Sequence, residues 1–328
     1  MRAIVCKAWG PPESLVIEDR SPLEAGPGKV VVSVKAASVK FADTLIIQNK
    51  YQTQPELPFI PGSEVTGIVK SIGAGVAGWK VGDRVSAQTT YGGYAEEVVA
   101  EPERLTAIPA SMDFASAAGL SSTYGTSYYA LVDRGQLRAG ETLLVLGAAG
   151  GAGLAAVEIG KVLGARVIAC ASSDEKLAVC REHGADETIN YASEDMRARV
   201  KAITKGNGVD VIYDPVGGQY SELALRDMAW GGRHLVIGFT AGDIPKIPLN
   251  LPLIKGCSVV GVWIGAFARR EPERYRANAA EIWKWVAAGK VKPHVSGRYP
   301  LERAADALNA LMARKVAGKV VLTPGSKD

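Results

Sequence analysis

Cysteine and histidine are scarce in this chain, with four cysteines and three histidines among 328 residues. The cysteines are widely separated and form no Cys-X-X-Cys or Cys/His spacing; they are Cys6, Cys170, Cys180 and Cys257. Such spacings mark disulfide frameworks and zinc sites, so neither is expected here. Buried free thiols in a reducing compartment, and no bound metal, fit the pattern better.

The chain also lacks long apolar runs and clusters of basic charge. No run of apolar residues reaches the roughly 18 needed to span a membrane, and the opening MRAIVCKAWGPPES has no apolar signal-peptide core. The net charge of +4 is small, and Lys and Arg are spread along the chain, which argues against a nucleic-acid binder. We therefore expect a cytoplasmic protein with neither a nucleic-acid nor a membrane partner.

Two different patterns divide the chain, whose length favours two domains. Residues 1–110 read as short strands broken by Gly and Pro, as in 29–39 and 64–73, which is typical of a β-rich barrel. From Glu141 onward, beginning with the strand 142–147, apolar strands alternate with helices. This alternation predicts a parallel sheet that is covered on both faces.

The run VLGAAGGAG at 145–153 concentrates glycine between a strand and a helix. Gly147, Gly150 and Gly153 have the spacing Gly-X-X-Gly-X-X-Gly, with Gly151 added. A tight strand–helix turn uses the same residues, so the triplet alone is a weak signal. At the head of a strand–helix series it favours a dinucleotide, whose pyrophosphate approaches backbone N–H groups at the positive helix end.

The second strand of this series ends without the acid of an NAD site. In such a site an Asp or Glu about 20 residues beyond the glycines bonds the ribose 2′-hydroxyl, whereas this chain reads Ser172-Ser173. Both hydroxyls can donate to a 2′-phosphate, and Lys176 is within reach if a helix begins at the serines. Helix capping explains either serine alone equally well, and Asp174 also suits an N-cap. Together the residues favour NADPH over NADH.

At this point the chain resembles the medium-chain dehydrogenase/reductase superfamily, and within it the zinc-free quinone oxidoreductases of the zeta-crystallin type. The resemblance runs through nearly the whole chain. Its main carriers are DTLIIQNKYQTQPELPFIPGSEVTGIVKSIGAGV (43–76), GDRV (82–85), GAAGGAGLAAVEIGKVLGARVIACASSDEK (147–176), GADETINY (184–191), DPVGG (214–218), GGRHLVIGFTAG (231–242) and GKVVL (318–322).

The resemblance implies an α/β fold in which a doubly wound parallel (Rossmann) sheet domain is inserted in a β-rich GroES-like barrel domain. Residues 1–120 and 266–328 would form the GroES-like catalytic domain, and residues 121–265 the NADPH-binding domain. The C-terminal strand 318–323 would return to the first domain.

The residues at the zinc positions of related alcohol dehydrogenases differ in this chain. Where those enzymes have a Cys ligand three residues before an Asp, the chain has Lys40 before Asp43, and where they have the His of Gly-His-Glu it has Ser63. No cysteine stands in the segment 119–125. Lys40 also replaces the Asn of the Ser-Val-Asn-Phe that family members commonly have near the cofactor and substrate. It either brings a charge beside the nicotinamide or points elsewhere.

The resemblance also implies the residues around the cofactor. Backbone N–H groups at the glycine loop would hold the pyrophosphate, a second group would surround the 2′-phosphate and adenosine, and a third would flank the ribose and nicotinamide. In that order the expected residues are Gly150, Gly151 and Ala152; Ser172, Ser173, Lys176 and Tyr191; and Gly217, Phe239, Thr240, Trp263 and Ile264.

Tyr51 and Lys40 are the expected catalytic residues. By resemblance Tyr51 would face the substrate, although without the resemblance it reads as a half-buried loop tyrosine. His183, His234 and His294 fall in no position that the resemblance makes catalytic, and are read as structural or solvent-facing. A reduction without a dedicated acid–base pair suits hydride delivery to an electron-poor acceptor.

The function that follows is NADPH-dependent, zinc-independent reduction of quinones or related conjugated carbonyls, with a small-molecule quinone or enone as substrate. An enoyl-thioester or enone reductase on the same scaffold is the alternative, and it would use the basic segment 267–276 for the phosphates of a CoA substrate. A remote alternative is a nucleic-acid-binding or bulk structural role without catalysis.

The segment GCSVVGVWIG at 256–265 predicts a homodimer. It has no charge and no proline and is rich in β-branched residues, so we expect a strand over 257–265. A strand of this kind, left as an exposed edge, invites aggregation, and pairing with a two-fold mate satisfies its backbone. Burial inside the sheet of a monomer would explain the same composition.

Overall fold

The structure is a computed structural model that describes residues 1–52 and 54–325. Its internal contacts divide the chain into two compact units, one of Met1–Ser121 with Pro293–Asp328 and one of Ser122–Lys292. In the part of the chain that the structure describes, no helix is both long enough and apolar enough to cross a membrane. The four cysteines are free, and Cys257 is the one that is not buried.

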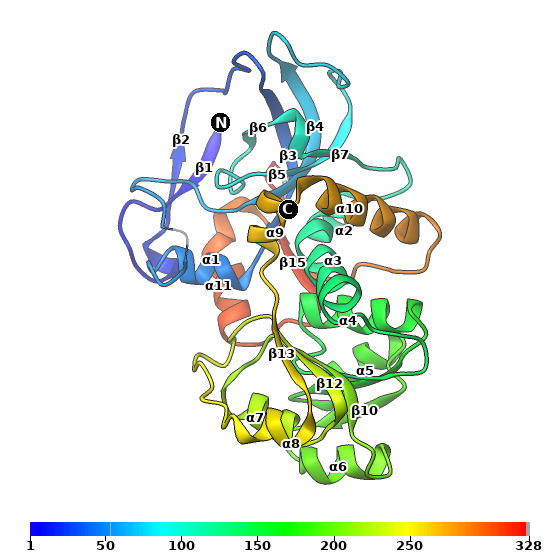
Figure 1. Cartoon of the computed structure of the whole chain (residues 1–328). Coiled ribbons are helices and arrows are strands. Elements are labelled where there is room, and N and C mark those ends of the chain that lie inside the picture. The colour runs from blue at the N-terminus through cyan, green and yellow to red at the C-terminus, as the bar shows by residue number, and fades with distance from the viewer. Residues whose placement is uncertain (53, 326–328) are drawn as a thin grey trace. The chain divides into compact units, whose positions relative to one another are not determined.

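The first unit is built on a seven-stranded sheet in the order β14-β15-β3-β4-β5-β7, with β6 paired beside β3 and a separate two-stranded sheet β1-β2 (Figure 1). Its strands are β1 (Arg2–Val5), β2 (Val16–Asp19), β3 (Val30–Val39), β4 (Glu64–Ile72), β5 (Arg84–Gln88), β6 (Glu97–Ala100), β7 (Leu105–Ala107), β14 (Val295–Tyr299) and β15 (Lys319–Leu322). Its helices are α1 (Phe41–Ile46), α2 (Phe114–Ala117) and α11 (Ala304–Met312), with short turns at Pro12–Ser14, Pro102–Arg104 and Leu301–Arg303. α3 (Leu120–Tyr128) begins in this unit.

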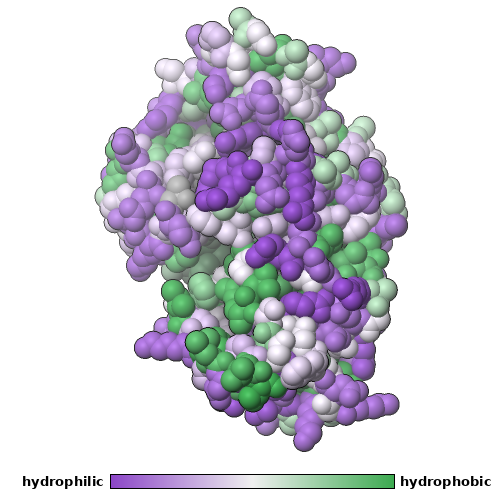
Figure 2. Space-filling model, viewed as in Figure 1, coloured by the Kyte–Doolittle hydropathy of each residue, from purple (hydrophilic) through white to green (hydrophobic). Residues whose placement is uncertain are grey.

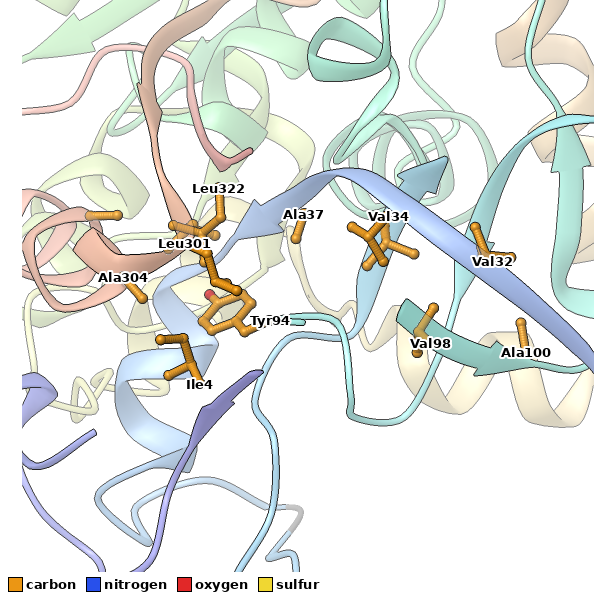
Figure 3. Close-up of a cluster of buried hydrophobic side chains, with 14 of the residues drawn as sticks. Ile4, Val32, Val34, Ala37, Tyr94, Val98, Ala100, Leu301, Ala304 and Leu322 are labelled. Atoms are coloured by element: carbon orange, nitrogen blue, oxygen red, sulfur yellow. The ribbon is translucent and has the colours of Figure 1, made fainter. Parts of the chain in front are cut away.

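The C-terminal strand does return to the first unit, as predicted. β15 pairs antiparallel with β3, with Val320 opposite Val39. Figure 3 shows why the return is stable: side chains of β3 and β6 share one buried cluster with Ile4, Leu301 and Leu322. Burial of such side chains is worth about 1.5–3 kcal/mol each, so the two distant parts of the chain form one core.

The second unit is a doubly wound α/β domain. Its six strands are all parallel, in the order β10-β9-β8-β11-β12-β13. They are β8 (Thr142–Val145), β9 (Arg166–Ala171), β10 (Glu187–Asn190), β11 (Val209–Asp214), β12 (Met228–Val236) and β13 (Ser258–Gly261). The helices are α4 (Gly151–Val162), α5 (Asp174–Glu182), α6 (Met196–Ile203), α7 (Gly218–Arg226), α8 (Asn250–Lys255), α9 (Ile264–Arg270) and α10 (Pro272–Ala287), with a helical turn at Tyr129–Arg134.

This order has its switch point between β8 and β11, where the chain changes its winding direction. Helices cover both faces of the sheet, with α4 and α5 on one side and α7 and α8 on the other (Figure 1). In open sheets of this kind ligands bind at the carboxyl ends of the strands beside the switch point. The sheet and its insertion between two parts of the first unit confirm the expected fold class.

Two boundaries differ from the expectations. The predicted strand 257–265 is shorter, because β13 ends at Gly261 and α9 begins at Ile264. The contacts also place the second unit boundary at Lys292/Pro293, whereas the sequence placed it at 265/266.

Aromatic packing explains the later boundary. Phe267 stacks on Tyr129 with 4.0 Å between ring centroids, and Trp285 packs on Tyr128 at 5.2 Å. These contacts attach α9 and α10 to the second unit, and no local pattern in the sequence predicts them.

Candidate active site

Packing explains two of the three spaced glycines. Gly147 has φ +57°, and a Cβ on it would lie 2.9 Å from the Val216 side chain. A Cβ on Gly153 would lie 2.3 Å from the carbonyl oxygen of Gly147. At Gly150, by contrast, φ is −71° and the nearest atom to a Cβ is 3.4 Å away. The exposed Gly150 therefore has room for a side chain, and a ligand that needs close approach to the backbone would account for the glycine.

The helix that follows is suited to an anion. α4 runs for 12 residues from Gly151, and its N-cap Gly150 has no side chain to bond the first N–H groups. Those groups, including that of Ala152, lie at the positive end of the helix dipole. These residues fit the pyrophosphate of a dinucleotide. The glycines leave space for it, and the backbone N–H groups can donate hydrogen bonds to it.

Ser172 and Ser173 have different roles at the end of β9. Ser173 is the N-cap of α5, and its hydroxyl accepts from the backbone N–H of Lys176 at 3.4 Å. The Lys176 ammonium donates to the Ser172 hydroxyl at 3.1 Å. Asp174, the other candidate for capping, instead accepts from the Asn190 side chain at 3.0 Å. An ammonium group and a hydroxyl group, from Lys176 and Ser172, thus lie where an NAD site has its acidic residue.

Tyr191 is brought to the same edge of the sheet. Its backbone N–H donates to the carbonyl of Ala171, the last residue of β9, at 3.1 Å. Its ring lies 4.7 Å from that of Tyr220, tilted by 44°. Tyr220 was missed in the sequence, although an aromatic residue in the first turn after β11 was a signal for it. The two rings offer flat apolar surface near Ser172.

The remaining expected cofactor residues follow β11, β12 and β13. Gly217 has φ +75° and ψ −153°, a region that only glycine adopts readily, and a Cβ there would lie 2.9 Å from the Phe239 ring. Thr240 bonds the carbonyl of Pro215 through both its N–H and its hydroxyl, each at 3.1 Å. Trp263 is 54% exposed and is the N-cap of α9, ahead of Ile264; both follow β13, which pairs with β12.

In the first unit, Lys40 follows β3 directly, and its side chain points into a polar cluster at the start of β4. Its ammonium donates to the Ser63 hydroxyl at 3.0 Å and lies 3.3 Å from a carboxylate oxygen of Glu64. Glu64 is fully buried, and its other oxygen accepts from the backbone N–H of Ser121 at 2.9 Å. The Lys40 side chain keeps 20% of its surface exposed. Lys40, Ser63 and Ser121, at or near the zinc-ligand positions of related alcohol dehydrogenases, therefore meet around Glu64 and an ammonium group.

A second, deeper set of groups supports this cluster. Asp43 accepts from the backbone N–H of Lys40 at 2.9 Å and from the Tyr94 hydroxyl at 2.7 Å; burial raises the pKa of its carboxyl, against the attraction of Lys40. Lys319 donates to the Ser38 hydroxyl. Burial lowers the pKa of Lys319 to about 8, and Glu64 opposes that shift. Two cations and two carboxyl groups are thus gathered in a buried region.

Tyr51 lies near this cluster. It is half-buried, and burial raises the pKa of its hydroxyl, with Asp43 close enough to raise it further. Tyr51 and Lys40 thus both lie close enough to Asp43 to interact with its carboxyl group electrostatically. At ordinary pH the Tyr51 hydroxyl keeps its proton and can donate it in a hydrogen bond.

The donor set of the first unit does not fit zinc. A protein zinc site needs three or four sulfur, nitrogen or oxygen ligands close together, and Lys40 and Ser63 provide an ammonium and a hydroxyl. Among residues 1–52 and 54–325 no group of three His, Cys, Asp or Glu side chains could hold a metal ion.

Comparison with known proteins supplies the family. A model described as an alcohol dehydrogenase GroES-like domain matches residues 26–126, and one described as a zinc-binding dehydrogenase matches 151–284. A quinone oxidoreductase-like protein 2 homolog of Nematostella vectensis is 40% identical over 325 residues, 98% of this chain and 88% of that protein. The quinone oxidoreductase of Pseudomonas aeruginosa is 37% identical over 319 residues, 97% of this chain and 98% of that one. The chain belongs to the quinone oxidoreductase family of the medium-chain dehydrogenase/reductase superfamily.

A solved structure of the family agrees over the full length. The Escherichia coli quinone oxidoreductase complexed with NADPH is 30% identical and superposes with a TM-score of 0.91 over 99% of this chain and 100% of that one. The chain is accordingly an oxidoreductase enzyme. The family model whose description includes zinc binding matches residues 151–284. That segment contains neither Lys40 nor Ser63, the residues at the zinc positions.

Proposed function

We propose that this oxidoreductase uses NADPH to reduce quinones or related conjugated carbonyls without zinc. The observation that carries the proposal is the Lys40 ammonium, held by Ser63 and Glu64. It provides a fixed cation for the carbonyl oxygen of an acceptor, so the first unit has an electrophilic group although its donor set does not fit a metal. Relatives named quinone oxidoreductases support the acceptor class.

NADPH is proposed as the cofactor on the residues of the second unit. Backbone N–H groups of Gly151 and Ala152 would hold the pyrophosphate, and Ser172 with Lys176 would hold the 2′-phosphate. Tyr191 would pack on the adenosine. When bound, NADPH supplies the hydride. The family member from Escherichia coli was solved with NADPH, which supports the choice.

The chain's own contribution to the reaction is electrostatic. As an acceptor carbonyl gains electrons, negative charge develops on its oxygen. The Lys40 ammonium stabilises that charge, and the Tyr51 hydroxyl donates a hydrogen bond to the same oxygen. The Ser63 and Glu64 contacts keep the ammonium in place, so that little reorganisation is needed during the reaction.

The enoyl-thioester alternative finds less support in the segment 267–276. Arg274 lies 2.6 Å from Asp133 and 3.3 Å from Glu271, and it also covers the Phe267 ring at 5.8 Å. The guanidinium of Arg269 lies over Trp263 at 5.5 Å. Two of the basic side chains are thus engaged in contacts with their own unit.

We predict that the purified enzyme oxidises NADPH with a simple quinone faster than with an enoyl-CoA thioester, and that a chelator leaves this rate unchanged. The reason is that the reaction depends on an ammonium group rather than on a metal. NADPH absorbance with each acceptor, before and after dialysis against chelator, measures both outcomes. Faster turnover of the enoyl-CoA would favour the alternative. One zinc per chain by elemental analysis, with activity lost on its removal, would contradict zinc independence.

We further propose a homodimer through the segment 256–265. β13 is an edge strand of the six-stranded sheet. Large apolar side chains stand exposed around it, as Figure 2 shows on the face over β13 and α8. They include Trp230, Leu253, Ile254 and Val259, which are 81%, 78%, 62% and 50% exposed. An open strand edge beside exposed apolar residues fits pairing with a second copy.

The dimer is expected to persist at micromolar concentration and to be weakened by Val259→Asp, which places a charge on the edge strand. Light scattering measures the mass of both proteins. Ile244→Asp is the matched control, because Ile244 is also exposed (72%) but precedes α8. A wild-type protein that scatters as a monomer rules the dimer out.

A further inference from the structure

Asp214 occupies a central place at the switch point of the second unit. It is the last residue of β11 and is only 2% exposed. One oxygen of its carboxylate accepts from the backbone N–H groups of Val216 and Gly217, both at 2.9 Å. The other accepts from the Ser221 hydroxyl and from Nε2 of His234 at 3.0 Å. Four donors from the following turn, α7 and β12 therefore meet on one carboxylate.

The charge state of Asp214 suits these donors. Burial alone raises the pKa of its carboxyl, but the hydrogen bond and charge of His234, with the bonds from Ser221 and Gly217, bring that pKa below its ordinary value. The group is therefore an ionised acceptor. Because the carboxylate only accepts, Nε2 of His234 carries the hydrogen in this bond.

The turn at 215–218, which Asp214 holds, is also hydrogen-bonded to the loop that follows β12. Pro215 accepts from Thr240, and the carbonyl of Val216 accepts from the N–H of Ala241 at 2.8 Å. The N–H of Gly218 donates to the carbonyl of Asp243 at 3.1 Å. The two loops are also in close contact where Gly217 meets Phe239. Displacing the first loop must therefore displace the second.

We propose that Asp214 is a positioning residue for the nicotinamide half of the cofactor. Through the turn at 215–218 it holds Gly217, Phe239 and Thr240, which the resemblance leads us to expect beside the ribose and nicotinamide. The adenosine half is held elsewhere, by Ser172 and Lys176 beyond β9. This inference rests on the proposed NADPH function, and it separates the two halves of the cofactor.

The test compares two ligands on one variant. Asp214→Asn replaces one of the accepting oxygens by an amide that donates, so the two donors on that oxygen lose their acceptor. NADPH binds both halves of the site, whereas 2′,5′-ADP binds the adenosine half alone. We expect Asp214→Asn to raise the Kd for NADPH about tenfold or more, because a loosened turn at 215–218 adopts its binding geometry only part of the time, and to leave the Kd for 2′,5′-ADP unchanged.

Two further variants complete the experiment. Asp210→Asn is the matched control, because Asp210 lies near the other end of β11 and its carboxylate accepts from the N–H of Thr142 at 2.8 Å; we expect it to change neither Kd. Ser221→Ala removes one donor and keeps the backbone bonds, so a smaller rise in the Kd for NADPH is expected. Binding of 2′,5′-ADP also shows that each variant is folded.

Either of two results would overturn the positioning role: equal weakening of both ligands by Asp214→Asn, or no weakening of NADPH. Failure of the wild-type protein to bind 2′,5′-ADP is a different result. It would overturn the proposed cofactor, and this inference with it.

Discussion

Ser172→Asp is expected to lower the affinity for NADPH by about 10- to 150-fold while sparing NADH, because a charge-assisted contact is worth roughly 1.5–3 kcal/mol. In the structure the Lys176 ammonium lies 3.1 Å from the Ser172 hydroxyl. A carboxylate at this position would pair with that ammonium and repel a 2′-phosphate. The ribose 2′-hydroxyl of NADH can instead donate to the carboxylate. Fluorescence titration with both cofactors measures the change.

Ser173→Asp is the matched control for this prediction. Ser173 caps α5 through its side chain, and aspartate is also a good N-cap, so the helix should remain intact with one added charge. We expect a smaller loss of NADPH affinity than for Ser172→Asp. If the wild-type protein binds NADPH and NADH equally, the assignment of Ser172 and Lys176 to the 2′-phosphate is wrong.

Local patterns predicted the regular parts of this fold well. β3, β4 and the six parallel strands coincide with apolar or alternating segments bounded by Gly, Pro or polar residues, so their pattern and length identify them without tertiary information. The glycine loop at 147–153 could also be predicted, because the sequence places it between a strand and a helix. What decides these features lies within a few residues of each.

Features that depend on distant contacts were less readable. From the sequence, the Lys40 side chain could either bring a charge beside the nicotinamide or point elsewhere. Its direction in the structure depends on Ser63 and Glu64, more than 20 residues away. Tyr220 meets Tyr191 only after the sheet has formed. The end of the second unit at Lys292 likewise depends on aromatic contacts of α9 and α10 with residues near 129.

The network around Asp214 shows the same limit. DPVGG at 214–218 was noticed as a motif of the resemblance, but its aspartate has no local meaning without Ser221 and His234. His234, read from the sequence as structural or solvent-facing, is 2% exposed and bonded to Asp214. His183 likewise bonds the buried Glu158 at 2.7 Å. A side chain's partners across a sheet follow from strand order, which periodicity does not reveal.

Lys40→Asn is expected to lower kcat for quinone reduction by about 100-fold, the effect of removing one group that stabilises a developing oxyanion. Asparagine restores the residue that family members commonly have, but it removes the charge that we assign to the acceptor oxygen. Because the interaction strengthens as charge develops, kcat and kcat/KM should fall together. Steady-state rates with NADPH and a simple quinone measure both.

The fully buried Glu64 complicates the single variant, because loss of Lys40 leaves a buried carboxylate without its nearest cation. The double variant Lys40→Asn with Glu64→Gln removes both charges, and its amide oxygen can still accept from Ser121. We expect the double variant to recover thermal stability but not activity. Lys40→Arg, which keeps a cation, should lose less than either.

Tyr51→Phe separates the two catalytic groups. A single neutral hydrogen bond is worth about 1 kcal/mol, so this variant should lose only about fivefold in kcat and kcat/KM. The opposite result would be a larger loss of kcat in Tyr51→Phe than in the double variant, with the double variant keeping the wild-type kcat. In that case the Tyr51 hydroxyl stabilises the acceptor oxygen, and the Lys40 ammonium serves only to neutralise Glu64. A larger loss at Lys40 than at Tyr51, with folding restored by Glu64→Gln, assigns the electrostatic role to the ammonium.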